Sequence, residues 1–500
     1  MESGSPPAGS IRLSTLEGFM PYAYVRQIYC FPTTDPLSAI DVLSRGLIGL
    51  AQDVPYILSR IIRDESGIAV SAICQKPEDL LSWNDLSESI SYAALQAANF
   101  PPHVFLAPGI VPPDTITPYP ASPAVLRVRA SIVDGGLVLC VALHHAVTDI
   151  AGFGALLRLW AAHCRGESSG DIGFHASWLD RSPLFVSATA NPSTLSDKAP
   201  MPDLLHILTP EEKARATAAR AQITKNDYRT CILYFPQQRL RTLKDAVNTY
   251  VAAQDPGTWV STSDVLASLL WSAIITAQED SEISKSNTVA DTRGDNERSS
   301  TLSFPVQFRS ILQPPLPRDF LGAAFVMMSA RVLHSDLRLI SRPVHDSSAD
   351  AETEQLLSAV DITTLARTAL AIRQSIQNID DIAVREVLAY LETHANANSG
   401  EQLVLGPPRY DSAGGSGTSV VSWADQGVYE LDWGESLGPC DAVRLPKMGT
   451  ERAPIVLPRV PSVNGDGGGL EVIMSYEGGI MQRVMDNPVI RQFAVLRCLS

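Results

Sequence analysis

The sequence predicts a mixed α/β protein that folds as two lobes. At 500 residues, the chain exceeds the size at which a single hydrophobic core usually stops growing. Apolar residues make up 45% of the chain and charged residues 19%, a composition typical of globular proteins. Strand and helix patterns mix in the first third and begin again near residue 228. We therefore expect a first lobe at residues 1–225, which ends in a crossover segment, and a second lobe at residues 226–500.

The first lobe contains a predicted β-hairpin followed by a helix. Residues 125–133 alternate between apolar and polar side chains, the tripeptide at 134–136 is a turn signal, and residues 137–143 form a continuous apolar strand. Large apolar side chains between Phe153 and Trp160 then recur at helical spacing. Residues 144–149 are therefore expected at a strand-to-helix turn.

The second lobe is predicted to follow an irregular crossover at residues 166–226. Ser263 is the candidate N-cap of a helix whose apolar face spans residues 265–274, and the polar stretch 278–300 is expected to be a surface loop. The other expected elements are strands at 228–235, 303–309 and 470–477, helices between 351 and 394 and at 480–485, and a loop at 395–418.

The net charge and the cysteines exclude several kinds of partner and cofactor. The net charge of −15 argues against nucleic acid or an anionic membrane as the main partner. The seven cysteines show no CxxC pair and no metal-ligand spacing, so we expect no metal and a reducing compartment. We find no secretory signal pattern and no apolar run long enough for a transmembrane helix. The expectation is a cytoplasmic monomer without a permanently bound cofactor.

Residues 144–153 read HHAVTDIAGF and contain the candidate general base. An imidazole at a strand-to-helix turn can face a cleft, and its ordinary pKa of about 6.5 suits proton transfer at neutral pH. We assign this role to His145. Adjacent side chains at a strand end point in opposite directions, so His144 is expected to face the interior. Asp149 either orients the imidazole or pairs with a cation elsewhere, and a buried structural histidine pair is the alternative for the dipeptide.

Short motifs follow one another over most of the chain. They are LSTLE at 13–17 with MP at 20–21 and YVR at 24–26, HxxxD at 145–149, FR at 308–309 followed by PPLP at 314–317 and Gly322, SW at 422–423, and DWG at 432–434. HxxxD alone is weak evidence, because carnitine acyltransferases and nonribosomal condensation domains carry similar motifs. In this order over roughly 420 residues, however, the elements together resemble the fungal branch of the BAHD acyltransferases, which includes the trichothecene O-acetyltransferases.

The resemblance implies two lobes of the chloramphenicol acetyltransferase type with a central solvent channel. Acyl-CoA would enter from one face and a small-molecule alcohol from the other. It also implies that Asp149 points away from His145 and pairs with Arg309. Trp423 would donate its indole N–H to the oxyanion or line the acyl channel, and the alternative is an aromatic that only fills the lobe interface.

The CoA side of the expected site is less well defined. Asp432 and Gly434 are expected to support a loop that shapes the donor channel. The CoA phosphates need cations, and the Gly-rich run of the chain lacks the strand and helix context of a P-loop. Lys447, Arg444 and Arg452 are the candidates for those contacts.

The function that the resemblance implies is acyl-CoA-dependent O-acylation, in the first place O-acetylation, of a hydroxyl on a fungal secondary metabolite. His145 would act by general-base catalysis in a ternary complex, because the sequence contains no nucleophile elbow that would support a covalent intermediate. Cys164 follows His163, but both fall in an apolar helix pattern, which argues against a nucleophilic thiol.

Three positions depart from the family pattern. Ile150 stands in the place of a glycine, so the turn must be made differently or shift to Gly152. Ala323 replaces an asparagine, and Val421 replaces a threonine whose hydroxyl would lie near the reaction centre. These departures leave alternatives open: a carrier-protein-dependent, condensation-like acyltransferase, or a pathway protein of this fold that no longer transfers acyl groups.

Overall fold

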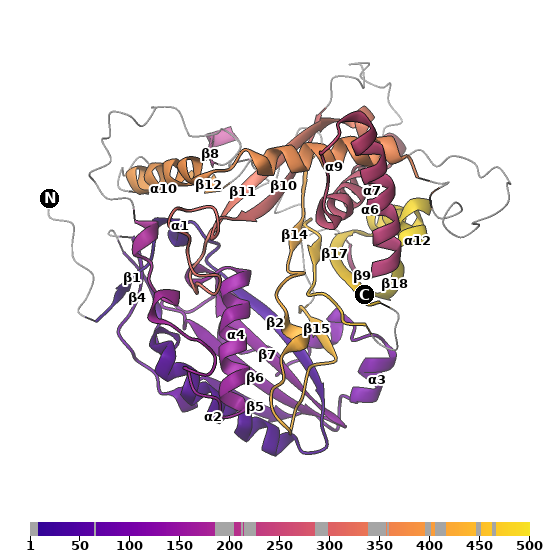
Figure 1. Cartoon of the computed structure of the whole chain (residues 1–500). Helices are drawn as coiled ribbons and strands as arrows, with labels where there is room; N and C mark the ends of the chain where they lie inside the picture. Colours follow the sequence, from indigo (N-terminus) through magenta and orange to yellow (C-terminus); the bar gives the residue numbers. More distant parts are fainter. Residues whose placement is uncertain are drawn as a thin grey trace.

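The computed structural model describes residues 9–64, 67–185, 205–211, 214, 227–285, 299–338, 357, 360–395, 402–405, 417–446, 452–462 and 467–500. Two mixed five-stranded sheets form the centres of two lobes, with the first lobe below the second in Figure 1. The expected two-lobed α/β architecture is therefore confirmed.

The first-lobe sheet has the strand order β15-β2-β7-β6-β5. The expected hairpin is present, and Gly135 in its turn has a φ of +82°, which glycine adopts without strain. Every residue of the second hairpin strand is buried, which explains its uninterrupted apolar sequence. The strands are β2 (Tyr24–Pro32), β5 (Leu81–Asp85), β6 (Leu126–Val133), β7 (Gly136–His144) and β15 (Ala442–Arg444).

Helices cover both faces of this sheet. On one face, α2 (Pro36–Asp53) and α4 (Ile150–Cys164) pack together, and the indole of Trp160 donates to the Leu43 carbonyl at 3.0 Å. On the other face lies α3 (Tyr92–Ala97). A small sheet of β1 (Ile11–Arg12), β3 (Ile61–Asp64) and β4 (Gly67–Val70) lies next to the short helix α1 (Thr15–Gly18).

The second lobe contains a five-stranded sheet of order β14-β16-β17-β9-β18 and a three-stranded sheet of order β11-β10-β13. Their strands are β9 (Tyr228–Pro236), β10 (Ser299–Gln307), β11 (Phe325–Leu333), β13 (Gly417–Ser419), β14 (Val421–Ser422), β16 (Ile455–Val456), β17 (Gly469–Glu477) and β18 (Val495–Leu499). The helices of this lobe are α6 (Gln237–Gln254), α7 (Thr262–Lys285), α9 (Ile362–Gln377), α10 (Asp381–Ala395), α11 (Gly478–Asp486) and α12 (Pro488–Phe493). A pair of strands, β8 (Leu205–Leu208) and β12 (Gln402–Leu405), joins the crossover segment to the second half of the chain.

The expected boundary at residues 225 and 226 needs one correction. β15 pairs with β2, so a segment from the second half of the chain becomes the edge strand of the first-lobe sheet (Figure 1). Trp433, in the preceding DWG motif, is fully buried in the first-lobe core. Packing therefore assigns the DWG element to the first lobe, because its large aromatic side chain is buried there.

Several element boundaries also differ from expectation. The helix α7 begins at Thr262, and Ser261 rather than Ser263 faces its first turn: the backbone N–H and hydroxyl of Ser261 donate to the Asp264 carboxylate at 2.7 and 2.8 Å. The helix also continues to Lys285 through part of the stretch expected to be a loop, while residues 286–298 lie outside the described part of the chain. The sequence patterns did not predict the strand β18.

Among the described residues, no helix has the length and apolar character needed to cross a bilayer.

Candidate active site

His145 lies between the strand β7 and the helix α4, in the 3₁₀ turn η5 (His145–Val147). Its backbone N–H donates to the Ala23 carbonyl at 2.8 Å, which ties the turn to the start of β2. Its ring Nδ1 lies 3.2 Å from the Thr148 carbonyl oxygen. A carbonyl can only accept, so Nδ1 carries the proton and Nε2 is the basic nitrogen of the neutral ring. The side chain is partly exposed, as a base that meets a substrate must be.

His144 has the structural environment that the sequence predicts. Its side chain is fully buried, Nδ1 accepts the backbone N–H of Ala146 at 3.3 Å, and the ring packs edge-on against Tyr22. Burial, and then the neighbouring charges of His145 and Arg63, lower the pKa of His144 from 6.5 to about 3. His144 is therefore neutral at physiological pH.

Asp149 is paired with Arg309 across the lobe interface. The guanidinium donates to the two carboxylate oxygens at 2.7 Å each, and both residues are 5% exposed. The same carboxylate accepts the backbone N–H groups of Gly152 and Ala324, each at 2.9 Å. The interactions of Asp149 are thus with α4 and the second lobe, and not with the imidazole of His145.

The departure at Ile150 has a local explanation. A Cβ at Gly152 would lie 2.2 Å from the Thr148 hydroxyl and 3.0 Å from the Leu321 carbonyl oxygen, so only glycine fits there. The glycine that the turn needs therefore stands two positions later than in the family pattern. Ile150 instead packs against a small apolar cluster at the lobe interface that contains Trp423.

Trp423 is a member of this cluster, and Ile150 directly follows the HxxxD turn, defined here as residues 145–149. It follows the short strand β14, its backbone N–H donates to the Val456 carbonyl at 2.8 Å, and its side chain is 9% exposed. The same cluster includes Val421, which occupies the position of the missing threonine. The structure thus brings Trp423 and Val421 near Ile150.

The DWG element makes its contacts in the first lobe. The Asp432 carboxylate accepts the Gly434 backbone N–H at 2.9 Å, and the Asp432 carbonyl accepts from Arg165. Gly434 has a φ of +95°, and the Trp433 indole lies edge-on to Trp160 with 5.0 Å between ring centroids. This element anchors the crossing segment in the first-lobe core.

The structure gives different environments to the basic residues expected to contact the CoA phosphates. Arg444 is buried at 3% exposure and donates to the Glu471 carboxylate at 2.6 Å, so it is not available to a solvent-exposed phosphate. Arg452 is already paired with Glu477. Lys447 lies outside the described residues. The expectation is therefore wrong for Arg444, because its charge is used inside the protein.

Cys164 is excluded as a nucleophile by its surroundings. Burial raises the pKa of its thiol to about 12, so the reactive thiolate is not populated at neutral pH. The neighbouring His163 has its Nε2 2.8 Å from the Asp53 carboxylate. The seven cysteines are all free thiols.

An apolar cavity of about 270 Å³ lies in the second lobe beside β14. Val420 and Ser422 line it, immediately before Trp423. Its other walls come from the start of α7, from β10 and from α9, and carry the side chains of Ser263, Asp264, Leu266, Ala267, Phe304, Pro305, Val306, Gln307, Ile372, Ile376, Val456 and Leu470. Residues 420–423 therefore connect the wall of this cavity to the apolar cluster against which Ile150 packs.

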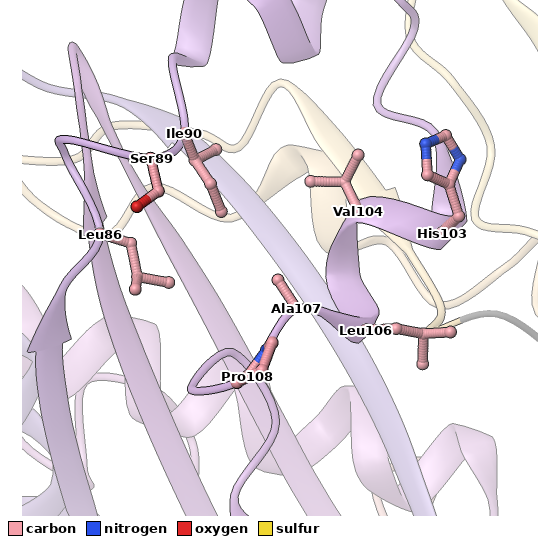
Figure 2. A pocket seen from close by; sticks show the side chains of 8 residues that line it. All are labelled: Leu86, Ser89, Ile90, His103, Val104, Leu106, Ala107 and Pro108. Atoms are coloured by element: carbon pink, nitrogen blue, oxygen red, sulfur yellow. The ribbon is translucent and has the colours of Figure 1, made fainter.

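A second depression, of about 510 Å³, lies on the first lobe between the end of β5 and the 3₁₀ turn after α3 (Figure 2). Figure 2 shows His103 and Leu106 on that turn at its rim. None of its lining residues belongs to the motifs. They are Leu86, Ser89, Ile90, His103, Val104, Leu106, Ala107 and Pro108.

Two polar features near the lobe interface were missed by the sequence reasoning. Glu17 is fully buried and pairs with Arg181 at 2.9 Å; the Ser14-x-x-Glu17 spacing of a capping box was a usable signal for Glu17, but nothing in the sequence indicates Arg181. The amides of Gln27 and Gln426 donate to each other at 3.0 and 3.1 Å, and neither has a sequence signature.

Comparison with known proteins identifies two matching families. Residues 107–359, just over half of the chain, match the family described as Transferase family. Residues 23–164 match the trichothecene 3-O-acetyltransferase-like N-terminal domain. Among similar proteins, the O-acetyltransferase ptmV of Penicillium ochrochloron is 23% identical over 97% of this chain and 96% of its own length. The O-acetyltransferase astG of Aspergillus oryzae is 24% identical over 85% and 90%.

Solved structures share the fold. TRI101 of F. sporotrichioides, complexed with coenzyme A and T-2, superposes with a TM-score of 0.73 at 20% identity over 98% of this chain and 99% of that chain. TRI101 of F. graminearum, complexed with coenzyme A and deoxynivalenol, gives 0.68 at 17% identity over 98% and 100%. Taken with the family match over half of the chain, these findings show that the chain belongs to the transferase family and is a fungal BAHD-type, trichothecene acetyltransferase-like acyltransferase.

Proposed function

We propose that the protein is an acyl-CoA-dependent O-acyltransferase, in the first place an O-acetyltransferase, that modifies a hydroxyl of a fungal secondary metabolite. The acyl group passes directly from the thioester to the alcohol in a ternary complex between the lobes. Relatives named O-acetyltransferase support this reaction class, and coenzyme A in structures of the same fold supports the donor. We further propose that the protein acts as a monomer in the cytoplasm, where its seven thiols would stay reduced.

The hydrogen bond between the His145 ring and the Thr148 carbonyl carries this proposal. With its Nδ1–H donated to the Thr148 carbonyl, the neutral ring has its basic nitrogen at Nε2, and this atom takes the proton of the acceptor hydroxyl. Asp149 is neutralised by Arg309, so its negative charge does not act on the imidazole directly. His145 is the general base, and Asp149 fixes the turn that carries it.

The thioester carbonyl becomes an oxyanion during the attack and needs a hydrogen-bond donor. Trp423 belongs to the apolar cluster against which Ile150, the residue after the HxxxD turn, packs, and it carries an indole N–H. We assign this donor role, or the lining of the acyl channel, to Trp423. We assign the cavity beside β14 to the narrow arm of an acyl-CoA, because aliphatic walls can hold its methylene groups while Ser263 and Ser422 offer partners for its amides.

The experiment that tests the function follows thiol release from acetyl-CoA in the presence of a panel of hydroxylated terpenoids and polyketides, with product mass as the second readout. We expect thiol release that depends on the acceptor and yields an O-acetylated product. Release from an acyl carrier protein but not from acyl-CoA would favour the carrier-protein alternative. Binding of an alcohol without transfer from either donor would favour a non-catalytic role.

A further inference from the structure

A second buried ion pair lies beside the HxxxD turn. Glu17 of α1 is fully buried and Arg181 is 5% exposed. Nε of Arg181 donates to the two carboxylate oxygens of Glu17 at 2.9 and 3.2 Å, and its guanidinium lies over the Tyr56 ring at 5.1 Å. Nη2 of the same guanidinium donates to the Val147 carbonyl at 3.0 Å, two residues after His145.

The other side of this pair reaches the second lobe. The Glu17 carboxylate accepts the Ser14 backbone N–H at 2.7 Å, which closes the capping box of α1. It also accepts the backbone N–H of Ala323 at 3.4 Å. Leu16, beside Glu17, is buried in the second-lobe core. The pair therefore connects the HxxxD turn to the segment around Ala323.

The ion pairs Asp149–Arg309 and Glu17–Arg181 make similar contacts beside the HxxxD turn. Asp149 accepts the backbone N–H of Ala324, and Glu17 accepts that of the preceding residue. Arg309 fixes Asp149 at one end of the turn, while Arg181 fixes the Val147 carbonyl in its middle. The hydrogen bond from His145 to Thr148 is made inside the same short turn, so a shift of Val147 must change it.

Stability alone is a poor explanation for such a pair. Removing two charges from water costs about as much free energy as their attraction returns, and buried pairs can often be replaced by apolar residues without loss. A rigid pair does fix geometry, and a misplacement of about 1 Å near a reacting group can lower turnover by about 100-fold.

We propose that Glu17 and Arg181 are positioning residues for acyl transfer: the pair holds the Val147 carbonyl in place and thereby sets the orientation of the His145 imidazole. This proposal rests on the function proposed above. It gives the LSTLE motif at residues 13–17 a role in the active site, although α1 itself carries no reacting group.

The test uses Arg181→Lys, which keeps the positive charge beside Glu17 but replaces the separate Nε and Nη2 donors to the carboxylate and the Val147 carbonyl by a single nitrogen. The matched control is Arg444→Lys. Arg444 is also buried, and it too donates both to a carboxylate, that of Glu471, and to backbone carbonyls, those of Asn99 and Phe100. Both variants should lose thermal stability to a similar extent, since each weakens one buried pair.

Two readouts distinguish positioning from general structural support. NMR titration of the His145 ring, assigned with a His145→Gln variant, should give a pKa lower by about half a unit or more in Arg181→Lys, because the Nδ1–H bond that favours the charged ring is weakened. The Arg444→Lys variant should keep the parental value. With substrates, kcat of Arg181→Lys should fall about 10- to 100-fold while both KM values stay within about twofold.

A double variant of Arg181→Lys and His145→Ala tests whether Arg181 acts through His145. If Arg181 acts through His145, Arg181→Lys should lower the activity of the parent but not the residual activity of His145→Ala. An equal loss in both backgrounds, or an unchanged His145 pKa in folded Arg181→Lys, overturns the proposal.

The NMR titration needs no substrate, so it decides the positioning role even when the parent transfers no acyl group, and that failure counts against the proposed function alone. Should Arg181→Lys not fold, Glu17→Asp takes its place. This variant keeps both charges and withdraws the carboxylate by one methylene. The same lowered pKa is expected, and a parental pKa would overturn the proposal.

Discussion

At the scale of single residues, the adjacent histidines show how neighbouring positions obtain different environments. His144 ends a buried strand and is fully enclosed, whereas His145 begins the turn and is partly exposed. The alternation of side chains along a strand predicts this difference from the sequence. The tautomer of His145 was not predictable, because it depends on the Thr148 carbonyl turning back toward the ring.

Replacing His145 by alanine should lower kcat by about 10²- to 10⁴-fold, the usual contribution of a general base. Folding should be retained, because the side chain is partly exposed and its hydrogen bond to the Thr148 carbonyl stays within the turn. Steady-state kinetics and circular dichroism measure both quantities. The exposed His175 provides the control, since His175→Ala should keep parental kcat. A folded His145→Ala variant with near-parental turnover would remove His145 from the mechanism.

His144 should make the protein sensitive to acid. Its pKa is about 3 in the folded protein against 6.5 for an unperturbed histidine, so between these values the unfolded chain binds a proton that the folded chain does not. The free energy of unfolding therefore falls as the pH drops below 6.5, by up to about 1.4 kcal/mol per pH unit. His144→Asn keeps an acceptor for the Ala146 N–H but does not titrate.

Urea unfolding at a series of pH values tests this expectation. Between pH 7 and pH 5 the parent should lose up to about 2 kcal/mol more than His144→Asn, even if the variant is less stable at pH 7. His175→Asn should follow the parent. Parallel curves for the parent and His144→Asn would show that His144 is not a buried neutral ring.

At the scale of elements, the pair of Asp149 and Arg309 joins the start of α4 to the second lobe. Removing either partner leaves a buried charge without compensation and should cost about 3–5 kcal/mol. The double variant Asp149→Ala/Arg309→Ala should be no less stable than the worse single variant. Asp149→Asn should be milder than Asp149→Ala, because it can still accept the Gly152 N–H.

The part-exposed pair of Arg158 and Asp319 is the matched control for this cycle. Its loss should cost less than about 1 kcal/mol, since water screens the two charges. Chemical denaturation of the single and double variants gives the coupling energies. Additive losses at Asp149 and Arg309 would contradict the paired geometry.

The cavity beside β14 leads to a separate prediction about the donor. Ala267→Leu adds three carbons to its wall, and should raise KM for acyl-CoA by about tenfold while KM for the acceptor stays within about twofold. The control is Ala252→Leu, the same change on an exposed position of α6. Steady-state kinetics with each substrate varied in turn gives both constants. A rise in KM for the acceptor alone would assign the cavity to the other substrate.

At the scale of the whole molecule, the two lobes are linked by segments that cross between them. Local patterns predicted the first hairpin, α4 and the strands β9 and β17, because their apolar periodicity is strong. The crossing of β15 was not predictable: a three-residue strand has no periodicity, and its partner β2 lies more than 400 positions earlier. The burial of Arg444 depends on the same crossing. The pairing of Asp149 with Arg309 followed from the family resemblance and not from either residue alone, whereas its bidentate geometry was not predicted.

The central claim is direct transfer with His145 as the base, and it is tested most directly by mixing the protein with acetyl-CoA alone and then with acetyl-CoA plus an acceptor. Rapid-quench thiol release and intact-protein mass are measured in each case, for the parent and for His145→Ala. Without acceptor, we expect neither a stoichiometric burst of thiol nor a covalent acetyl group. With acceptor, we expect turnover that is about 10²- to 10⁴-fold lower in His145→Ala. A burst of thiol with one acetyl group bound to the protein in the absence of acceptor would contradict this mechanism.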